Sequence, residues 1–226
     1  MPDSAAFAGQ EVIVFGAAGA LGAGLAAAFS AAGASVTGAD KATPSPGDQV
    51  DGVRYQTVDV LDDDAVGAFF TGAQVPWAVI NTVGGFAPAA PLTDLDPGVL
   101  AGQFQLNLVS AALITKHALR RMQAAGQGRI VHTASRAAIV TRGSGFAYSV
   151  TKLGVLHLVT MAAEEVRGTG ITVNSVVPTI IDTPANRRAM PKADHASWPT
   201  VAAIAPAYLF LASPEAHLVS GAAIPV

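Results

Sequence analysis

The sequence predicts an α/β fold, a single-domain doubly wound parallel sheet of about seven strands with helices on both faces. Short β-branched runs alternate with longer Ala- and Leu-rich segments of helical period along all 226 residues. Several of the strand segments, such as residues 77–81, are strongly apolar, as expected for strands buried on both faces. No interior stretch resembles a linker, so residues 1–226 are expected to form one domain. Strands are expected at residues 11–15, 34–39, 53–60, 77–81, 126–135, 171–177 and 222–226.

Helical segments are expected between these strands, each long enough to return the chain to the start of the next parallel strand. Residues 44–52 have the composition of a surface loop, and residues 179–199, rich in Pro, Met and charge, form the least regular segment. We expect residues 179–199 to act as a lid that orders over bound substrate. The helices are expected at residues 23–32, from 62 onward, 100–125, 147–166 and 201–211.

Composition excludes several classes of function. With 13 Lys and Arg against 16 Asp and Glu, the net charge of -3 argues against a nucleic acid or an anionic membrane as partner. The absence of Cys removes disulfides, thiolate catalysis and cysteine metal sites, and favours a cytoplasmic protein. No export signal is recognised in residues 1–4, and no metal is expected, because the five histidines lack metal-site spacing: His117, His132, His157, His195 and His217.

Residues 12–39 carry no charge and are long enough to span a bilayer on hydropathy alone. Glycines, Ser and Thr interrupt this stretch, and its period changes from strand-like to helix-like and back. A buried βαβ unit has this composition, so we reject a transmembrane segment here.

The turn after the first strand, residues 16–22, has three glycines at a spacing of three. Gly16 permits a tight turn, Gly19 lets the backbone approach a pyrophosphate, and Gly22 allows close packing of helix and strand. This is the pattern of a Rossmann-type nucleotide site, although a plain turn in an Ala- and Gly-rich protein also has this composition. The loop residues expected beside the cofactor are Gly16, Ala18, Gly19, Ala20, Leu21 and Gly22.

Asp40 stands at the tip of the second strand, 18 residues after Gly22. A carboxylate there accepts hydrogen bonds from the adenosine ribose hydroxyls and repels a 2′-phosphate, so NAD(H) is preferred and NADP(H) is disfavoured. The neighbouring Lys41 softens that preference. Asp59 and Val60, at the end of the third strand, are expected near the adenine, with capping of the next helix an equally good explanation for Asp59.

The fourth strand ends in Asn81-Thr82-Val83-Gly84, where a second wall of the crevice is needed. We expect Asn81, Val83 and Gly84 to lie against the cofactor, although glycines also simply make turns. Asn107 lies within an apolar helical pattern, where an unpaired buried amide costs about 1 to 3 kcal/mol. It is either a satisfied core residue or a structural link in a proton relay to Lys152.

Tyr148 and Lys152 stand four residues apart, so a helix places them on one face. A Lys ammonium beside a Tyr hydroxyl stabilises phenolate, and we therefore expect the Tyr148 pKa to be lowered towards working pH. Ser135, thirteen residues before Tyr148, ends an apolar strand. Alone, the Tyr–Lys pair is common by chance, and the nucleotide site is what gives it a function.

These residues together resemble the short-chain dehydrogenase/reductase family over nearly the whole chain. The resemblance implies that Tyr148 is the general acid/base, that Lys152 holds the nicotinamide ribose, and that Ser135 orients the substrate oxygen. By the same resemblance, Asn107 anchors a water molecule in the proton relay. It also implies that the segment after Pro178 contacts the nicotinamide carboxamide through the Ile181 backbone and the Thr183 hydroxyl.

Departures from the family pattern include Phe15 before the glycine loop, Ala20 within it, and Thr179 after Pro178. Together with residues 182–194 and Trp198, the Gly19 to Gly22 segment resembles the dihydropteridine reductase branch. Ser135 favours ordinary carbonyl chemistry instead, because a quinonoid pterin receives hydride without a polarised ketone. The side chains proposed to shape the substrate pocket are Phe86, Arg136, Phe146, Asn186, Met190 and Trp198, each of which could instead serve core or surface packing.

The sequence therefore predicts an NAD(H)-dependent oxidoreductase that transfers hydride between nicotinamide and a small carbonyl or alcohol. A quinonoid dihydropterin is the alternative substrate. A non-catalytic NAD-binding sensor is a competing function of a different class, and an epimerase or dehydratase with a retained cofactor is a weaker one. Because the helices starting near residues 100 and 147 are apolar around much of their circumference, we expect a homodimer or homotetramer.

Overall fold

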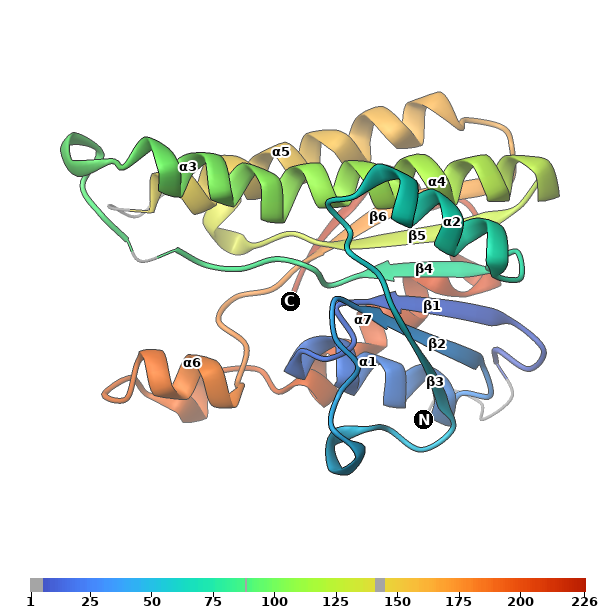
Figure 1. The fold of residues 1–226 in the computed structure, drawn as a ribbon, viewed down its shortest axis with the longest axis horizontal. Helices are drawn as coiled ribbons and strands as arrows, with labels where there is room; N and C mark the ends of the chain where they lie inside the picture. Colours follow the sequence, from blue (N-terminus) through green and yellow to red (C-terminus); the bar gives the residue numbers. More distant parts are fainter. Residues whose placement is uncertain (1–5, 88, 141–144) are drawn as a thin grey trace.

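The computed structural model describes residues 6–87, 89–140 and 145–226. Seven strands form one parallel sheet, as the sequence predicts, in the order β3-β2-β1-β4-β5-β6-β7 (Figure 1). From β1 the chain adds β2 and β3 towards one edge of the sheet, and from β4 it adds β5, β6 and β7 towards the other edge. The strand order therefore reverses between β1 and β4, and a crevice lies at the carboxyl ends of these two strands. The strands are β1 (Glu11–Phe15), β2 (Ser35–Asp40), β3 (Val53–Thr57), β4 (Ala78–Asn81), β5 (Gly128–Thr133), β6 (Ile171–Val177) and β7 (Ala223–Pro225).

Helices cover both faces of this sheet. On one face of the sheet, a core cluster joins α1 and α7 to strand side chains such as Val12, Val14 and Ile80. On the other face, a second cluster joins α2, α4 and α5 to the strand residues that alternate with these, such as Ile13 and Val79. Alternation along each strand thus fills two separate cores, which explains the near-continuous apolar runs. The helices are α1 (Ala20–Ala31), α2 (Asp63–Gly72), α3 (Pro97–Gln103), α4 (Ser110–Ala125), α5 (Phe146–Glu165), α6 (Pro184–Ala189) and α7 (Val201–Ala212).

Several boundaries differ from the prediction. β3 ends at Thr57 rather than at residue 60, and β5 is shorter at both ends than residues 126–135. The predicted helix at residues 100–125 begins earlier, at Pro97, and passes through a π-helical segment, Phe104–Val109, before α4. Hydrogen-bond partners in the neighbouring strand, which a sequence pattern does not show, decide where each strand ends.

The segment 179–199 contains more regular structure than expected. It includes α6 and a 3₁₀ turn, His195–Ser197, and its two ends meet where Asp182 bridges Thr200. Figure 1 shows α6 projecting beyond the carboxyl ends of the strands, on the same side as the first turns of α3 and α5. These segments surround the carboxyl edge of the sheet, which is where open α/β folds bind their ligands.

Two helical stretches, Pro97–Ala125 and Phe146–Glu165, are long and apolar enough to cross a membrane by length and composition. Both pack on the sheet, and each carries buried polar side chains, Asn107 in the first and Lys152 in the second. The rejected candidate at residues 12–39 forms β1, α1 and most of β2, the expected βαβ unit. Residues 1–4, where an export signal was sought, lie outside the described residues.

Candidate active site

The glycine turn between β1 and α1 has the expected geometry. Gly16 has a φ of +83°, and a Cβ at this position would overlap the Thr82 hydroxyl. A Cβ on Gly22 would overlap the Gly16 carbonyl group, so only glycine lets α1 start this close to the turn. α1 begins without a side-chain cap and without an acidic residue in its first turn, which leaves its amino end ready to receive a phosphate.

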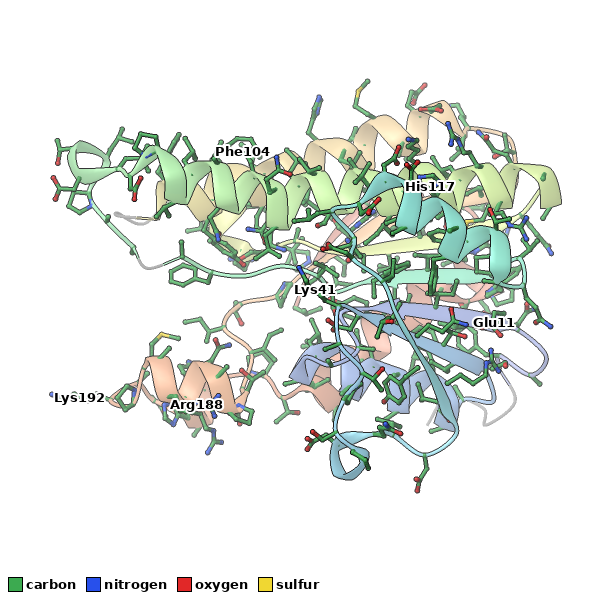
Figure 2. The ribbon with its side chains drawn as sticks, in the orientation of Figure 1. Glu11, Lys41, Phe104, His117, Arg188 and Lys192 are labelled. Atoms are coloured by element: carbon green, nitrogen blue, oxygen red, sulfur yellow. The ribbon has the colours of Figure 1, made fainter. Side chains whose placement is uncertain are left out.

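Asp40 ends β2 beside this turn. One of its carboxylate oxygens accepts the Ala18 N–H at 2.9 Å and the other accepts the Lys41 N–H at 2.7 Å. A carboxylate offers about four acceptor positions, so capacity remains for ribose hydroxyls. Lys41 forms an ion pair with Asp59 at 3.0 Å, and Figure 2 shows Lys41 at the carboxyl edge of the sheet.

Asp59 does not cap the following helix. Asp62 does so, accepting hydrogen bonds from the Asp64 and Ala65 N–H groups, whereas Asp59 accepts the Leu61 N–H within the loop. The Leu61 N–H and the Lys41 side chain hold the Asp59 pKa below its ordinary value. The helix-capping explanation for Asp59 is therefore wrong, and its predicted place near the adenine stays a prediction. Val60 packs against the core under α2.

The segment 81–85 lies between the glycine turn and the helix that carries Lys152. Asn81 is buried and its side-chain oxygen accepts the Val83 N–H at 3.0 Å. A Cβ on Gly84 would lie 2.7 Å from Asn107 Oδ1 and 2.9 Å from Lys152 Nζ. Glycine at position 84 thus permits the backbone to touch both polar groups, which is more than a turn requires.

Asn107 is fully paired in the π-helical segment. Its Oδ1 accepts the Gly85 N–H at 2.9 Å. Its amide nitrogen, which carries two hydrogens, lies 3.0 to 3.2 Å from three acceptors, the Gly85 carbonyl, Gln103 Oε1 and Thr151 Oγ1. π-helical turns occur frequently at functional sites, because they re-aim one side chain within a helix. Here the turn directs Asn107 at the backbone beside Lys152, which fits both a core role and a relay role for this residue.

Lys152 is buried on the sheet-facing side of α5. Its ammonium group donates to the Thr133 carbonyl oxygen at 2.9 Å, at the carboxyl end of β5. Burial lowers the Lys152 pKa to about 8, so the side chain is mostly charged at neutral pH. Its Nζ lies 6.0 Å from the centroid of the Tyr148 ring.

Tyr148 does not have the lowered pKa that the sequence predicted. Burial raises the Tyr148 pKa, and a hydrogen bond with the Ser135 side chain only partly opposes this effect. The prediction was wrong because it counted the positive charge of Lys152 and left out desolvation of the phenolate. The protein by itself therefore keeps Tyr148 protonated, and Ser135, whose oxygen accepts the Ala137 N–H, lies beside it.

The predicted substrate residues divide into two groups. Phe86 is 64% exposed and packs edge-on against the Tyr148 ring, with centroids 5.1 Å apart, so it lies at the reacting group. Phe146 and Arg136 lie near Tyr148 and Ser135 in sequence and are exposed, so their contact with substrate stays a prediction. The remaining candidates, Asn186, Met190 and Trp198, make contacts within the segment after β6.

In that segment, the Asn186 side chain donates to the Ile181 carbonyl, and the Thr183 hydroxyl accepts the Asn186 N–H. The Met190 carbonyl accepts a hydrogen bond from His195, whose ring packs against Trp198. Asn186, Met190 and Trp198 thus stabilise the segment itself, and their contact with substrate stays a prediction. Pro178 is tied to the site through its carbonyl, which accepts the Arg136 N–H at 2.9 Å.

Sequence reasoning missed several residues that hold these groups in place. Thr82 donates to the Phe15 carbonyl and so fixes the glycine turn, and the Thr133 carbonyl holds Lys152. His132 is fully buried and hydrogen-bonds Asn81. A polar residue inside an apolar strand was the available signal for His132 and Thr133. Within the described ranges, no group of three or more His, Asp or Glu side chains is placed to hold a metal ion.

Three features of this site are typical of a nucleotide-dependent oxidoreductase. They are the glycine turn at the amino end of α1, the acidic residue that ends β2, and the Ser–Tyr–Lys group near the end of β5. Residues 16–226 match a family model described as enoyl-(acyl carrier protein) reductase. The chain belongs to the short-chain dehydrogenase/reductase family, and it is an NAD(P)-dependent oxidoreductase of that type.

Two relatives and one solved structure illustrate the likeness. The chain is 34% identical to cis-4-hydroxycyclohexanecarboxylate dehydrogenase from Sinomonas cyclohexanicum, over 98% of this chain and 96% of the relative. It is 30% identical to D-threitol dehydrogenase from Mycolicibacterium smegmatis, over 95% and 90%. The structure of a short-chain dehydrogenase/reductase from Mycobacterium ulcerans superposes with a TM-score of 0.89 and 28% identity, over 97% of this chain and 89% of that one.

Proposed function

We propose that this protein interconverts a small secondary alcohol and its ketone with NAD(H) as cofactor. The observation that carries the proposal is the grouping at the carboxyl end of β5, where Lys152 is held by the Thr133 carbonyl beside Tyr148 and Ser135. A sensor that only binds nucleotide has no need of this arrangement.

The residues present fit a dinucleotide. Gly16 and Gly22 have no room for a Cβ, and the uncapped start of α1 faces the turn that they form. Asp40 supports NAD(H) over NADP(H), because its carboxylate repels a 2′-phosphate. Lys41, the cation nearest to Asp40 in sequence, forms an exposed ion pair with Asp59, which opposes only weakly the expected softening of this preference.

The chain's own residues then handle the proton and the alignment. The nicotinamide, when bound, gives or takes the hydride. Tyr148 is protonated at neutral pH, because the ordinary pKa of tyrosine is about 10 and burial raises it further. It donates its hydroxyl proton to a substrate carbonyl oxygen and takes it back in the reverse direction. Ser135 orients the same oxygen through its hydroxyl hydrogen. Lys152 supplies a positive charge that stabilises Tyr148 after it has given up the proton.

The substrate side supports an apolar carbon skeleton beside the reacting carbon. Phe86 presents its exposed ring edge-on to Tyr148, and Ile139 and Ile180, 51% and 43% exposed, follow Ser135 and Pro178 closely in sequence. An apolar ring next to the proton donor favours a cyclic or branched alcohol over a polyol. We therefore propose a substrate of the kind named in the Sinomonas relative, and retain quinonoid dihydropterin as the alternative.

The test measures NAD⁺ reduction with cis-4-hydroxycyclohexanecarboxylate, cyclohexanol and D-threitol, and NADH oxidation with quinonoid dihydropterin. Each is repeated with Tyr148→Phe. We expect turnover of a cyclic alcohol and a loss of about 10² to 10⁴ in kcat for the variant, with the dissociation constant of NADH within about threefold of wild type. Turnover of the pterin alone would replace the proposed substrate, and NADH binding without turnover of any compound would favour the sensor.

We also propose a cytoplasmic homodimer or homotetramer without nucleic-acid or membrane partners. Support for assembly comes from the outer face of α5, where Leu153 and Met161 are 52% and 58% exposed two helical turns apart, with His157 between them. Apolar side chains repeated on one helix face are typical of a surface that packs against another copy.

A further inference from the structure

His132 is a buried titratable side chain at the centre of the sheet for which the mechanism above has no use. It is fully buried in β5, directly across the ladder from Asn81 in β4. Its Nδ1 lies 3.1 Å from Asn81 Nδ2, and its Nε2 lies 2.9 Å from Thr115 Oγ1 in α4. The imidazole therefore links α4 to the strand that enters the cofactor crevice.

The donors around His132 decide which of its ring nitrogens carries the hydrogen. The Thr115 hydroxyl donates its one hydrogen to the Ala111 carbonyl at 2.7 Å, so towards His132 it can only accept. The Nε2 atom must then be the donor, which leaves Nδ1 as an acceptor for the Asn81 amide. The hydrogen-bond chain runs in one direction, from Asn81 through His132 and Thr115 to Ala111.

This polarity fixes the orientation of the Asn81 amide. Because its nitrogen faces His132, its oxygen faces the backbone of its own turn and accepts the Val83 N–H at 3.0 Å. A reversed amide would set its NH₂ group against the Val83 N–H and its oxygen against the unprotonated Nδ1, so both hydrogen bonds would be lost. The turn after β4 thus has one hydrogen-bond arrangement, which the Val83 N–H and the unprotonated Nδ1 of His132 both require.

The turn that Asn81 orients touches both halves of the active site. The Val83 nitrogen would lie 3.0 Å from a Cβ on Gly16, and Gly84 lies against Asn107 and Lys152. We propose that His132 is a positioning residue. Acting as an uncharged acceptor for Asn81, it sets the segment 81–85 against the bound nucleotide and Lys152. This inference rests on the proposed cofactor site.

The surroundings keep the imidazole uncharged. Burial, and to a lesser extent the charge of Lys152, lower the His132 pKa to about 3. Protonation would also set an Nδ1–H against the Asn81 amide hydrogens. His132 therefore stays an uncharged acceptor for the Asn81 amide throughout the neutral pH range, as a positioning residue requires.

The test compares two amide variants. His132→Asn keeps an acceptor near the Nδ1 position, and His132→Gln reaches the Nε2 position and loses the acceptor for Asn81. Thr115→Val is the matched control, because it removes only the Thr115 hydroxyl, which lies on the side of His132 away from Asn81. We expect all three to lower the melting temperature. Only His132→Gln is expected to weaken NADH binding, by about tenfold, and His132→Asn should stay within about threefold of wild type.

Equal NADH affinities of His132→Asn and His132→Gln would overturn the proposal, as would a tenfold loss in Thr115→Val. Absence of NADH binding by the wild-type protein would instead refute the cofactor site itself. A second measurement needs no variant: nitrogen NMR of histidine-labelled protein should show the Nε2–H tautomer of His132, neutral down to about pH 5. Finding the Nδ1–H tautomer would overturn the proposal, because Asn81 could then not donate to it.

Discussion

Gly84→Ala tests how tightly the segment 81–85 is packed against the catalytic groups. The backbone at Gly84 is not in the left-handed region, so alanine meets no conformational strain and only the added methyl group matters. That methyl carbon would lie 2.7 Å from Asn107 Oδ1, and ordinary contact begins at 3.4 Å, so about 0.7 Å of movement is required.

Neither neighbour can give way freely. Asn107 accepts the Gly85 N–H and shares its two amide hydrogens among three acceptors, and Lys152 is held by the Thr133 carbonyl, so the backbone of the segment must move instead. Overpacking of this kind costs about 1 to 3 kcal/mol of stability. A misplacement approaching about 1 Å at an active site lowers the rate by up to about a hundredfold. We expect kcat to fall by about ten- to a hundredfold.

The assay combines steady-state turnover with thermal unfolding. Gly102→Ala is the control, because a Cβ there meets no heavy atom within 4 Å and the position lies in α3. It should leave kcat unchanged and raise stability slightly, by about 0.5 to 1 kcal/mol, as Ala replaces Gly in a helix. Wild-type kcat and melting temperature in Gly84→Ala would refute the close approach of Gly84 to Asn107 and Lys152.

Three further predictions concern charge, cofactor and assembly. The Lys152 pKa is about 8 in the folded protein and about 10.5 in the unfolded chain, so the unfolded state binds more protons above pH 8 and stability should rise with pH. Urea unfolding at about pH 7.5 and about pH 9.5 should show this rise in wild type, and its persistence in Lys152→Met would contradict the assignment. Asp40→Ala should lower the ratio of kcat/KM for NADH over NADPH by at least about tenfold in paired initial-rate assays, and an unchanged ratio would leave Asp40 without a role in cofactor choice. Light scattering at micromolar concentration should show a dimer or tetramer that Leu153→Asp shifts towards monomer, and a wild-type monomer would refute the proposed interface.

Much of the site could be predicted from local sequence patterns. The glycine turn and the Tyr148–Lys152 pair are such patterns, because residues three or four apart have a defined relative position in a turn or a helix. Asp40 was found instead from its place at the tip of a predicted strand, 18 residues after Gly22.

The residues expected in the lid show where local patterns give less. Asn186 and Trp198 were assigned to substrate by their place in the chain. The structure adds the contacts that they make within their own segment, and their contact with substrate stays a prediction.

The sequence by itself determined the succession of strands and helices along the chain, the glycine turn after β1 and the assignment of the chain to a family of NAD(P)-dependent oxidoreductases, because periodicity and short spacings are local properties. Only the tertiary structure decided that Asp62 rather than Asp59 caps α2, that burial raises the Tyr148 pKa, and that the His132 ring lies within hydrogen-bond distance of the Asn81 amide. The reason is physical: desolvation and hydrogen-bond partners depend on groups that packing brings together. Asn81 and His132 are 51 residues apart in the chain and meet only when β4 pairs with β5.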